Sequence, residues 1–178
     1  MALTGPNCSG KSTYARQVGL TVWLAQLGSF VPAEECDIRP VGALASRMGA
    51  RDDISSGRST FGCEAAEVAE ALEMGSRCST GALLLLDEMG RGTATLDGVA
   101  LAHATLAHVS RMPRVVAIFT THYAEVCDLA HQLAPIAALS HMEVAELAAA
   151  RTESKAGGGG AVAFSAAPGC AQGPVAVK

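Results

Sequence analysis

The sequence has few charged residues and no excess of basic ones. Only 17% of its 178 residues are Asp, Glu, Lys or Arg, and acids outnumber bases, so that the formal net charge is -4. A polybasic protein that binds nucleic acid or a membrane surface would show the opposite balance. We therefore expect any contact with DNA to come from a local patch or from regions outside this sequence.

Long apolar runs and paired cysteines are also missing. The longest apolar runs, such as residues 82–86, fall far short of the ~18 residues that a membrane span needs, so we expect a soluble protein without membrane contact. The first residues lack the charged and apolar regions of a signal peptide. None of the six cysteines belongs to a C-x-x-C pair, which favours reduced thiols in the cytosol or nucleus over disulfides or a zinc site.

Apolar residues nevertheless make up 49% of the chain, enough for a sizeable core. Short apolar runs alternate with longer helix-like stretches, a rhythm typical of an α/β protein with a mostly parallel central sheet flanked by helices. Strands are predicted at residues 2–4, 41–48, 82–86, 115–120, 138–146 and 161–165, helices at residues 12–27, 61–75 and 123–130 and after the glycine-rich turn at 90–98, and a polar loop at residues 51–59. We expect one domain over residues 1–150 and a Gly/Ala/Pro-rich tail over residues 151–178.

In the helix that follows residues 90–98, five residues recur at helical spacing. They are Leu96, Val99, Ala100, His103 and Leu106. This periodicity predicts that they lie on one side of the helix.

A phosphate-binding motif opens the chain. Residues 5–12 read Gly5-Pro6-Asn7-Cys8-Ser9-Gly10-Lys11-Ser12 and match the P-loop pattern G-x-x-x-x-G-K-[ST]. At ordinary residue frequencies, a chance match in a chain of this length has a probability of roughly one in a hundred. A strand precedes the motif and a helix follows it, so the loop N–H groups and the helix N-terminus converge on one anion.

The motif assigns a role to each of its polar side chains. Lys11 would contact the β and γ phosphates of a nucleotide, and Ser12 would hold Mg²⁺. Lys11 is also the only lysine among the first 154 residues, which fits either a bias toward arginine codons or a need for a compact ammonium at this place. Cys8 is either a reactive thiol at a helix N-terminus or a small filler at a variable motif position.

Acidic and imidazole side chains follow the next predicted strands. Asp87, at the end of the run 82–86, would bind Mg²⁺ through water, and Glu88 would polarise the attacking water as general base. The alternative is an ordinary strand that ends in acids. His122 follows the strand at residues 115–120 and would sense or stabilise the γ-phosphate, although a single histidine after a strand is more often structural.

Taken together, four segments occur in the order and spacing of one family. They are residues 4–13 (TGPNCSGKST), 59–61 (STF), 87–98 (DEMGRGTATLDG) and 121–122 (TH). With them the chain resembles the ATPase domain of the MutS family. The third segment is more specific than a P-loop, and a transporter or chromosome-cohesion ATPase would instead require a Leu-Ser-Gly-Gly signature, which the sequence lacks.

The resemblance implies a P-loop NTPase of the ABC-ATPase type, with ATP and Mg²⁺ bound at a composite site between two subunits. Each subunit would bind its own nucleotide through the P-loop, including Gly5, Pro6, Asn7, Cys8, Ser9, Gly10, Lys11, Ser12 and Thr13, with Ser12 and Asp87 for Mg²⁺ and Glu88 and His122 for catalysis. Ser59 and Thr60 would reach the γ-phosphate held by a MutS-like partner subunit. Their alternative role is to cap the helix that starts at Phe61.

The resemblance also implies a biological setting. The expected role is to switch a DNA clamp in mismatch repair or meiotic recombination, in the nucleus, with residues 28–34 and 127–144 most similar to the meiotic branch. The DNA-reading regions of the family lie upstream of this segment, so we expect a fragment of a longer protein. A nucleotide-gated dimerisation module, or an inactive remnant that binds ATP without turnover, stays open as the alternative.

Overall fold

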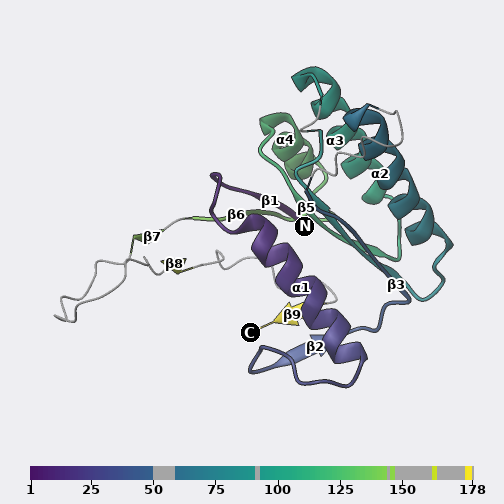
Figure 1. The fold of residues 1–178 in the computed structure, drawn as a ribbon, viewed down its shortest axis with the longest axis vertical. Coiled ribbons are helices and arrows are strands. Elements are labelled where there is room, and N and C mark those ends of the chain that lie inside the picture. The colour runs from purple at the N-terminus through teal and green to yellow at the C-terminus, as the bar shows by residue number, and fades with distance from the viewer. Residues whose placement is uncertain (50–58, 91–92, 144, 147–161, 164–174, 178) are drawn as a thin grey trace.

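The computed structural model describes residues 1–49, 59–90, 93–143, 145–146, 162–163 and 175–177. Strands and helices alternate along the chain (Figure 1). In chain order they are β1 (Ala2–Thr4), α1 (Lys11–Gln26), β2 (Cys36–Ile38), β3 (Ala43–Arg47), α2 (Thr60–Arg77), β4 (Ala82–Asp87), α3 (Thr95–Val109), β5 (Val115–Thr120), α4 (Ala124–Gln132), β6 (Leu139–His141), β7 (Ala145–Glu146), β8 (Val162–Ala163) and β9 (Val175–Val177). No helix in the described part of the chain is long and apolar enough to span a membrane.

The central sheet has five strands in the order β3-β4-β5-β1-β6. All of its described pairings are parallel, which confirms the predicted α/β class with a mostly parallel sheet. The register sets Asp87 of β4 opposite Thr120 of β5, and Thr120 opposite Leu3 of β1. Two short antiparallel pairs, β2 with β9 and β7 with β8, lie outside this sheet.

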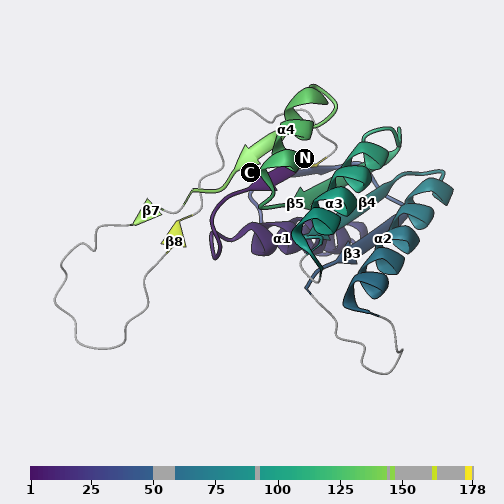
Figure 2. The same ribbon diagram turned by 90° about the horizontal axis from the view of Figure 1, so that it is seen from above.

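Helices cover both faces of the sheet. Figures 1 and 2 show α1 on one face and α2, α3 and α4 on the other. Successive side chains of a strand point to opposite faces, so the run of leucines in β4 serves both layers. Leu83 and Leu85 pack in a cluster with residues of α1, whereas Leu84 and Leu86 belong to the larger cluster beneath the other three helices. This arrangement explains why the strand has no polar alternation.

The side of α3 that the periodicity marks faces the core only in part. Leu96 is 84% exposed, and Ala100 and His103 are exposed as well. The buried residues of α3 are Gly98, Ala102, Thr105, Leu106 and Val109. Leu106 on the predicted side is buried and Val99 packs against the core, but Leu96, Ala100 and His103 are turned outward. The helix instead packs closely at Gly98, where a Cβ would lie 2.5 Å from the Gly90 carbonyl oxygen. This close approach requires the smallest residue, and it fixes the rotation of the helix.

The strand predicted at residues 138–146 is also divided. Its first part is β6, which pairs with β1 at the edge of the sheet, and its end is β7, which pairs with β8 elsewhere. The strand predicted at 41–48 is confirmed as β3, and the one at 161–165 contains β8. Strands β2 and β9 were missed, and the predicted loop at residues 51–59 falls outside the described residues except for Ser59.

A buried ion pair joins β3 to α2. Arg47 lies 3.4 Å from Glu64, with side chains only 8% and 3% exposed, and 3.0 Å from Glu67, which is 42% exposed. The Gly90 N–H also donates to Glu64, at 2.7 Å. A buried charge needs such partners because it has lost its hydration. The edge strand, the helix and the turn after β4 are therefore held together by one carboxylate.

Replacing Glu64 with Ala should lower the free energy of unfolding by about 3 kcal/mol, because it removes the buried partner of Arg47 and the acceptor of the Gly90 N–H. The matched control is Glu67→Ala on the same helix, which should cost at most about 1 kcal/mol because that carboxylate is partly solvated. Urea unfolding of the two variants checks the difference. Equal losses would contradict the role given to Glu64.

The two leucines with opposite exposure give a second stability test. Leu84→Ala should lower the free energy of unfolding by about 2–5 kcal/mol, since it opens a cavity in the sheet core. Leu96→Ala should change it by no more than about 0.5 kcal/mol, because that side chain faces solvent. Thermal and urea unfolding measure both. A large loss for Leu96→Ala would contradict the solvent exposure of that side chain.

Candidate functional site

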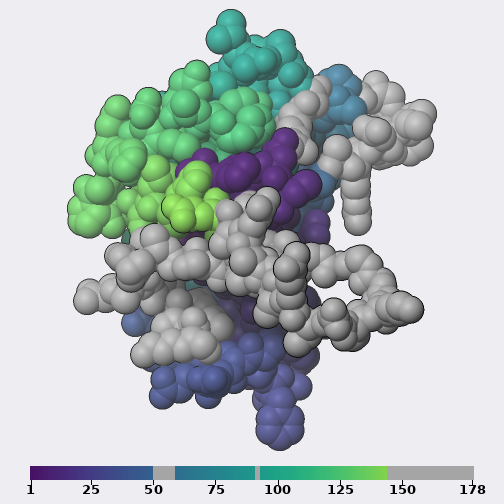
Figure 3. Space-filling model, turned by 90° about the vertical axis from the view of Figure 1, so that its left-hand side faces the viewer, coloured from purple at the N-terminus to yellow at the C-terminus, as the bar shows by residue number. Residues whose placement is uncertain are grey.

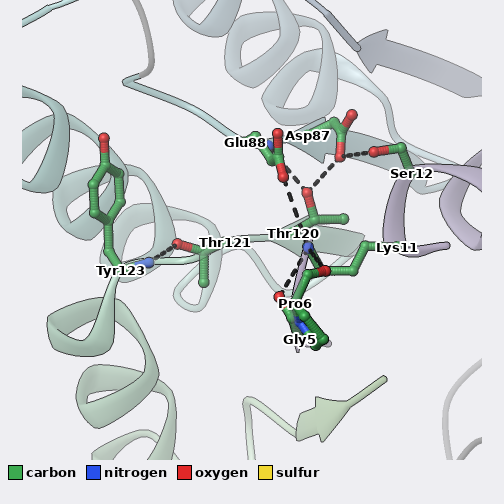
Figure 4. Close-up of polar contacts among 9 residues, drawn as sticks. All are labelled: Gly5, Pro6, Lys11, Ser12, Asp87, Glu88, Thr120, Thr121 and Tyr123. Carbon is green, nitrogen blue, oxygen red and sulfur yellow. Dashed lines mark hydrogen bonds and ion pairs between the residues drawn. The ribbon is translucent and has the colours of Figure 1, made fainter. Parts of the chain in front are cut away.

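Polar side chains gather where three neighbouring strands end. Strands β4, β5 and β1 are adjacent and parallel, so Asp87, Thr120 and Thr4 finish at the same edge of the sheet. In open α/β sheets this carboxyl edge is where ligands bind. Figure 4 shows the side chains that converge there.

The glycine-rich loop at residues 5–10 connects β1 to α1. Gly5 has φ +145°, and a Cβ at this position would lie 2.7 Å from the Met142 carbonyl oxygen, so only glycine fits. Cys8 and Gly10 adopt left-handed conformations, with φ +62° and +91°. These dihedral angles fold the loop back over the start of α1.

The tip of the loop faces solvent. Pro6, Asn7 and Cys8 are exposed, whereas Ser9 is buried. In the space-filling view, the purple N-terminal segment reaches the surface beside the green segment that contains α4 and β6 (Figure 3). The loop is therefore accessible to a ligand from outside. Thr13, in the first turn of α1, is exposed as well.

Lys11 folds back into the loop that precedes it. Its ammonium donates to the Gly5 and Pro6 carbonyl oxygens, both at 2.9 Å, and lies 3.8 Å from Glu88 Oε1. The residue is only 4% exposed. A buried ammonium is stable only with several partners, and here they come from the loop and from the end of β4. The structure thus brings Lys11 and Glu88 together.

The hydroxyl of Ser12 and the carboxylate of Asp87 are joined directly. Ser12 Oγ donates to Asp87 Oδ1 at 2.9 Å, and Asp87 is 6% exposed. Thr120 Oγ1 donates to the same oxygen at 2.5 Å. Sequence reasoning missed Thr120. The only signal that could have found it is its place opposite Asp87 in the sheet, which depends on the strand order.

Glu88 leaves the strand in an unusual conformation. Its φ of +46° lies in the left-handed region, which residues other than glycine seldom adopt. Its N–H donates to both the carbonyl oxygen and the hydroxyl of Thr120, at 3.1 and 3.0 Å. The side chain is 14% exposed. Non-glycine residues in this region cluster at functional sites because the surrounding structure has to hold them there.

The turn after Glu88 is fixed from two sides. Gly90, with φ +85°, donates its N–H to Glu64, and its carbonyl oxygen accepts from the Tyr123 hydroxyl at 3.1 Å. The backbone of Gly90 also packs against Gly98 of α3, because a Cβ on Gly90 would lie 2.4 Å from the Gly98 Cα. This contact explains the glycines at both ends of the segment 90–98. Arg91 and Gly92, in the same segment, fall outside the described residues.

His122, Ser59 and Thr60 are more peripheral in this chain. His122 is exposed and its ring lies against Tyr123, with centroids 4.3 Å apart, so no described contact joins it to Asp87 or Glu88. Ser59 is the N-cap of α2, and its hydroxyl accepts from the Gly62 N–H at 3.1 Å. The capping role is therefore confirmed for Ser59. Both Ser59 and Thr60 are exposed, at the edge where β3 ends and α2 begins.

Comparisons with known proteins agree with the motifs. The family model of MutS domain V matches residues 1–156. The DNA mismatch repair protein MutS of Streptococcus agalactiae is 49% identical over 131 residues, which cover 74% of this chain and 15% of that protein. The DNA mismatch repair protein MSH3 of Chaetomium globosum is 44% identical over 164 residues, which cover 92% of this chain and 14% of that protein.

The matched relatives are thus several times longer than this chain, which spans about 15% of their length. The match extends over nearly all of the described sheet and over every residue of the site at its carboxyl edge. On this evidence the chain belongs to the MutS family, of which it contains domain V.

Proposed function

We propose that this chain is the ATP-binding and hydrolysing module of a MutS-like DNA mismatch repair protein, with a P-loop NTPase fold of the ABC-ATPase type. The observation that carries the proposal is the hydrogen bond from Ser12, at the end of the glycine-rich loop, to Asp87, at the end of β4. It joins a phosphate-binding segment to an acidic one. The 3.8 Å approach of Lys11 to Glu88 supports the same assignment.

The loop and the start of α1 suit the phosphates of ATP. The helix dipole favours an anion at its N-terminus, and no acidic residue lies in the first turn of α1 to oppose it. Lys11 supplies a positive charge at the same place, paired in this structure with two loop carbonyls. An incoming phosphate would offer the ammonium a stronger, charged acceptor.

Ser12 and Asp87 fit the Mg²⁺ that accompanies ATP. Mg²⁺ prefers oxygen ligands, keeps several waters and is usually held by one or two carboxylates together with substrate phosphates. It therefore does not require a protein cage, and no group of three potential metal-binding His, Cys, Asp or Glu side chains occurs among the described residues. In this proposal, Ser12 would bind the ion directly and Asp87 would bind it through water, and the ion would supply positive charge next to the phosphates.

Glu88 is the proposed general base. Its carboxylate lies near Lys11 and is largely shielded from solvent, so it can orient a water and accept its proton when the γ-phosphate is attacked. His122 is proposed to sense the γ-phosphate. It is exposed beside this edge and would have to turn from Tyr123 toward the nucleotide.

The proposed active unit is a dimer with a MutS-like partner subunit. Ser59 and Thr60 are exposed at the N-terminus of α2, on the edge that carries the loop, so they can face a nucleotide held by a partner. DNA would be bound by regions outside this chain. Both relatives described above are named for mismatch repair, whereas a meiotic role and a nuclear location stay predictions.

A nucleotide-gated dimerisation module that binds ATP without turnover is the second candidate. It is supported by the exposure of Ser59 and Thr60 at the N-terminus of α2, where they could take part in an interface between subunits. The two candidates differ in steady-state hydrolysis, which the first requires in the full-length protein and the second lacks. For the isolated chain we expect weak hydrolysis, since part of each site comes from the partner.

Nucleotide binding should depend on Lys11. Lys11→Met should weaken binding of a fluorescent ATP analogue by about tenfold or more, because the phosphates lose a charged hydrogen-bond donor. Arg16→Met, an exposed change on the same helix, is the matched control and should bind like the unmodified chain. Thermal unfolding shows whether each variant is folded. Equal affinity in a folded Lys11→Met variant would refute the phosphate site.

Hydrolysis should depend on Glu88 without a matching loss of binding. In the full-length protein, Glu88→Gln should reduce the rate of Mg²⁺-dependent ATP hydrolysis by about 10²-fold or more, because the amide cannot accept the proton of the attacking water. ATP affinity should stay close to its original value. Glu125→Gln, on the exposed side of α4, serves as control. Undiminished turnover in Glu88→Gln would remove Glu88 from the mechanism.

A further inference from the structure

We propose that Thr120 is a positioning residue, whose hydroxyl holds Asp87 for Mg²⁺ binding and Glu88 for activation of water. The proposal rests on the function proposed above. It concerns a residue that belongs to none of the recognised motifs. The side chain of Thr120 is fully buried at the end of β5, between the two acids (Figure 4).

The two hydrogen bonds of Thr120 fix the direction of its hydroxyl proton. A hydroxyl has one proton to donate and two lone pairs to accept with. The Glu88 N–H arrives at Thr120 Oγ1 at 3.0 Å and uses a lone pair, while the proton is donated to Asp87 Oδ1 at 2.5 Å. The hydroxyl thus donates to the Asp87 carboxylate on one side and accepts from a backbone N–H on the other.

Asp87 gains a second donor from this arrangement. Ser12 and Thr120 donate to the same carboxylate oxygen, one from α1 and one from β5. If Ser12 held Mg²⁺, its oxygen would serve both the metal and the hydrogen bond to Asp87. Thr120 belongs to β5 and is not among the residues proposed to bind phosphate or metal, so its bond would hold the carboxylate in place whether or not the metal is present. Sites built on strands keep their geometry better than sites on loops.

Glu88 gains support for a strained backbone. The left-handed φ of +46° is unfavourable for glutamate and persists only when neighbours hold it. Thr120 provides two acceptors for the Glu88 N–H, its carbonyl oxygen and its hydroxyl. The first is the ordinary bond between neighbouring strands, whereas the second requires a hydroxyl side chain. In this conformation the Glu88 carboxylate lies 3.8 Å from Lys11.

The chain offers a matched control for a buried threonine. Thr21 on α1 is also 0% exposed, but its hydroxyl has no hydrogen-bond partner among the described residues. Thr21→Val therefore removes a hydroxyl of equal burial that contacts no part of the site. Valine has nearly the shape of threonine, so Thr120→Val removes the two bonds with little change in packing. Thr120→Ser keeps the hydroxyl.

The experiment compares these three variants of the full 178-residue chain with the unmodified chain. A fluorescent ATP analogue is titrated in EDTA and then at rising Mg²⁺, and hydrolysis of ATP is followed with protein in excess over nucleotide. For Thr120→Val we expect the affinity for the analogue in EDTA to stay within about twofold of the original. The Mg²⁺ concentration that produces half of the change in affinity should rise by about tenfold, and the rate of hydrolysis should fall by about tenfold or more. Thr120→Ser should restore most of the Mg²⁺ dependence and of the hydrolysis rate, and Thr21→Val should match the unmodified chain.

Several outcomes would overturn the inference. If Thr120→Val keeps the Mg²⁺ dependence and hydrolysis of the unmodified chain, or loses affinity equally with and without Mg²⁺, Thr120 does not position the acids, while the proposed function stands. If the unmodified chain binds no nucleotide under either condition, the proposed function fails and this inference fails with it. Thermal unfolding identifies a misfolded Thr120→Val variant. Thr120→Ala then replaces it in the same measurements, with the same expected and contrary results.

Discussion

The arrangement of the site depends on one buried carboxylate. Asp87 is charged and almost inaccessible to water, so its oxygens need hydrogen-bond donors from the protein. Ser12 and Thr120 supply them from two elements that are far apart in sequence. These bonds exist only if β4 lies beside β5 and if α1 begins close to the end of β4. Sheet order, loop position and the place of Glu88 are therefore linked to the same interaction.

A second set of contacts connects this centre to the side of the molecule where α2 begins. The Glu64 carboxylate accepts from the Gly90 N–H, and the Tyr123 hydroxyl donates to the Gly90 carbonyl oxygen. The turn after Glu88 is therefore connected both to α2 and to the segment that follows β5. In the proposed dimer, α2 presents Ser59 and Thr60 to the partner. If the proposed hydrolysis moved this turn, the hydrogen bond from Gly90 to Glu64 would transmit the movement to the first turns of α2. This gives a physical route by which two nucleotide sites could influence each other.

Much of the fold was predictable because its signals are local. The uninterrupted leucines of β4 and the glycine-rich loop before α1 identify a parallel α/β protein, and both are confirmed. The side of α3 that periodicity marks faces the core only in part, since Leu106 is buried and Leu96 is exposed, whereas Gly98, which the pattern leaves out, is buried. A helix that packs closely needs small residues at the contact, and such residues carry little hydrophobic signal. Strand β2 is three residues long, too short to show a pattern of its own.

By itself, the sequence determined the family, the fold class and the motif residues that converge on the site, because each motif is a short segment whose chemistry can be read directly. Only the tertiary structure decided which other residues contact these motif residues. Thr120 meets Asp87 through the register of two strands, and Glu64 meets Gly90 through the packing of α2 on the sheet. The two contacts join residues that are 33 and 26 positions apart in the chain. No local pattern encodes such pairs, since their distance is set by how the layers pack.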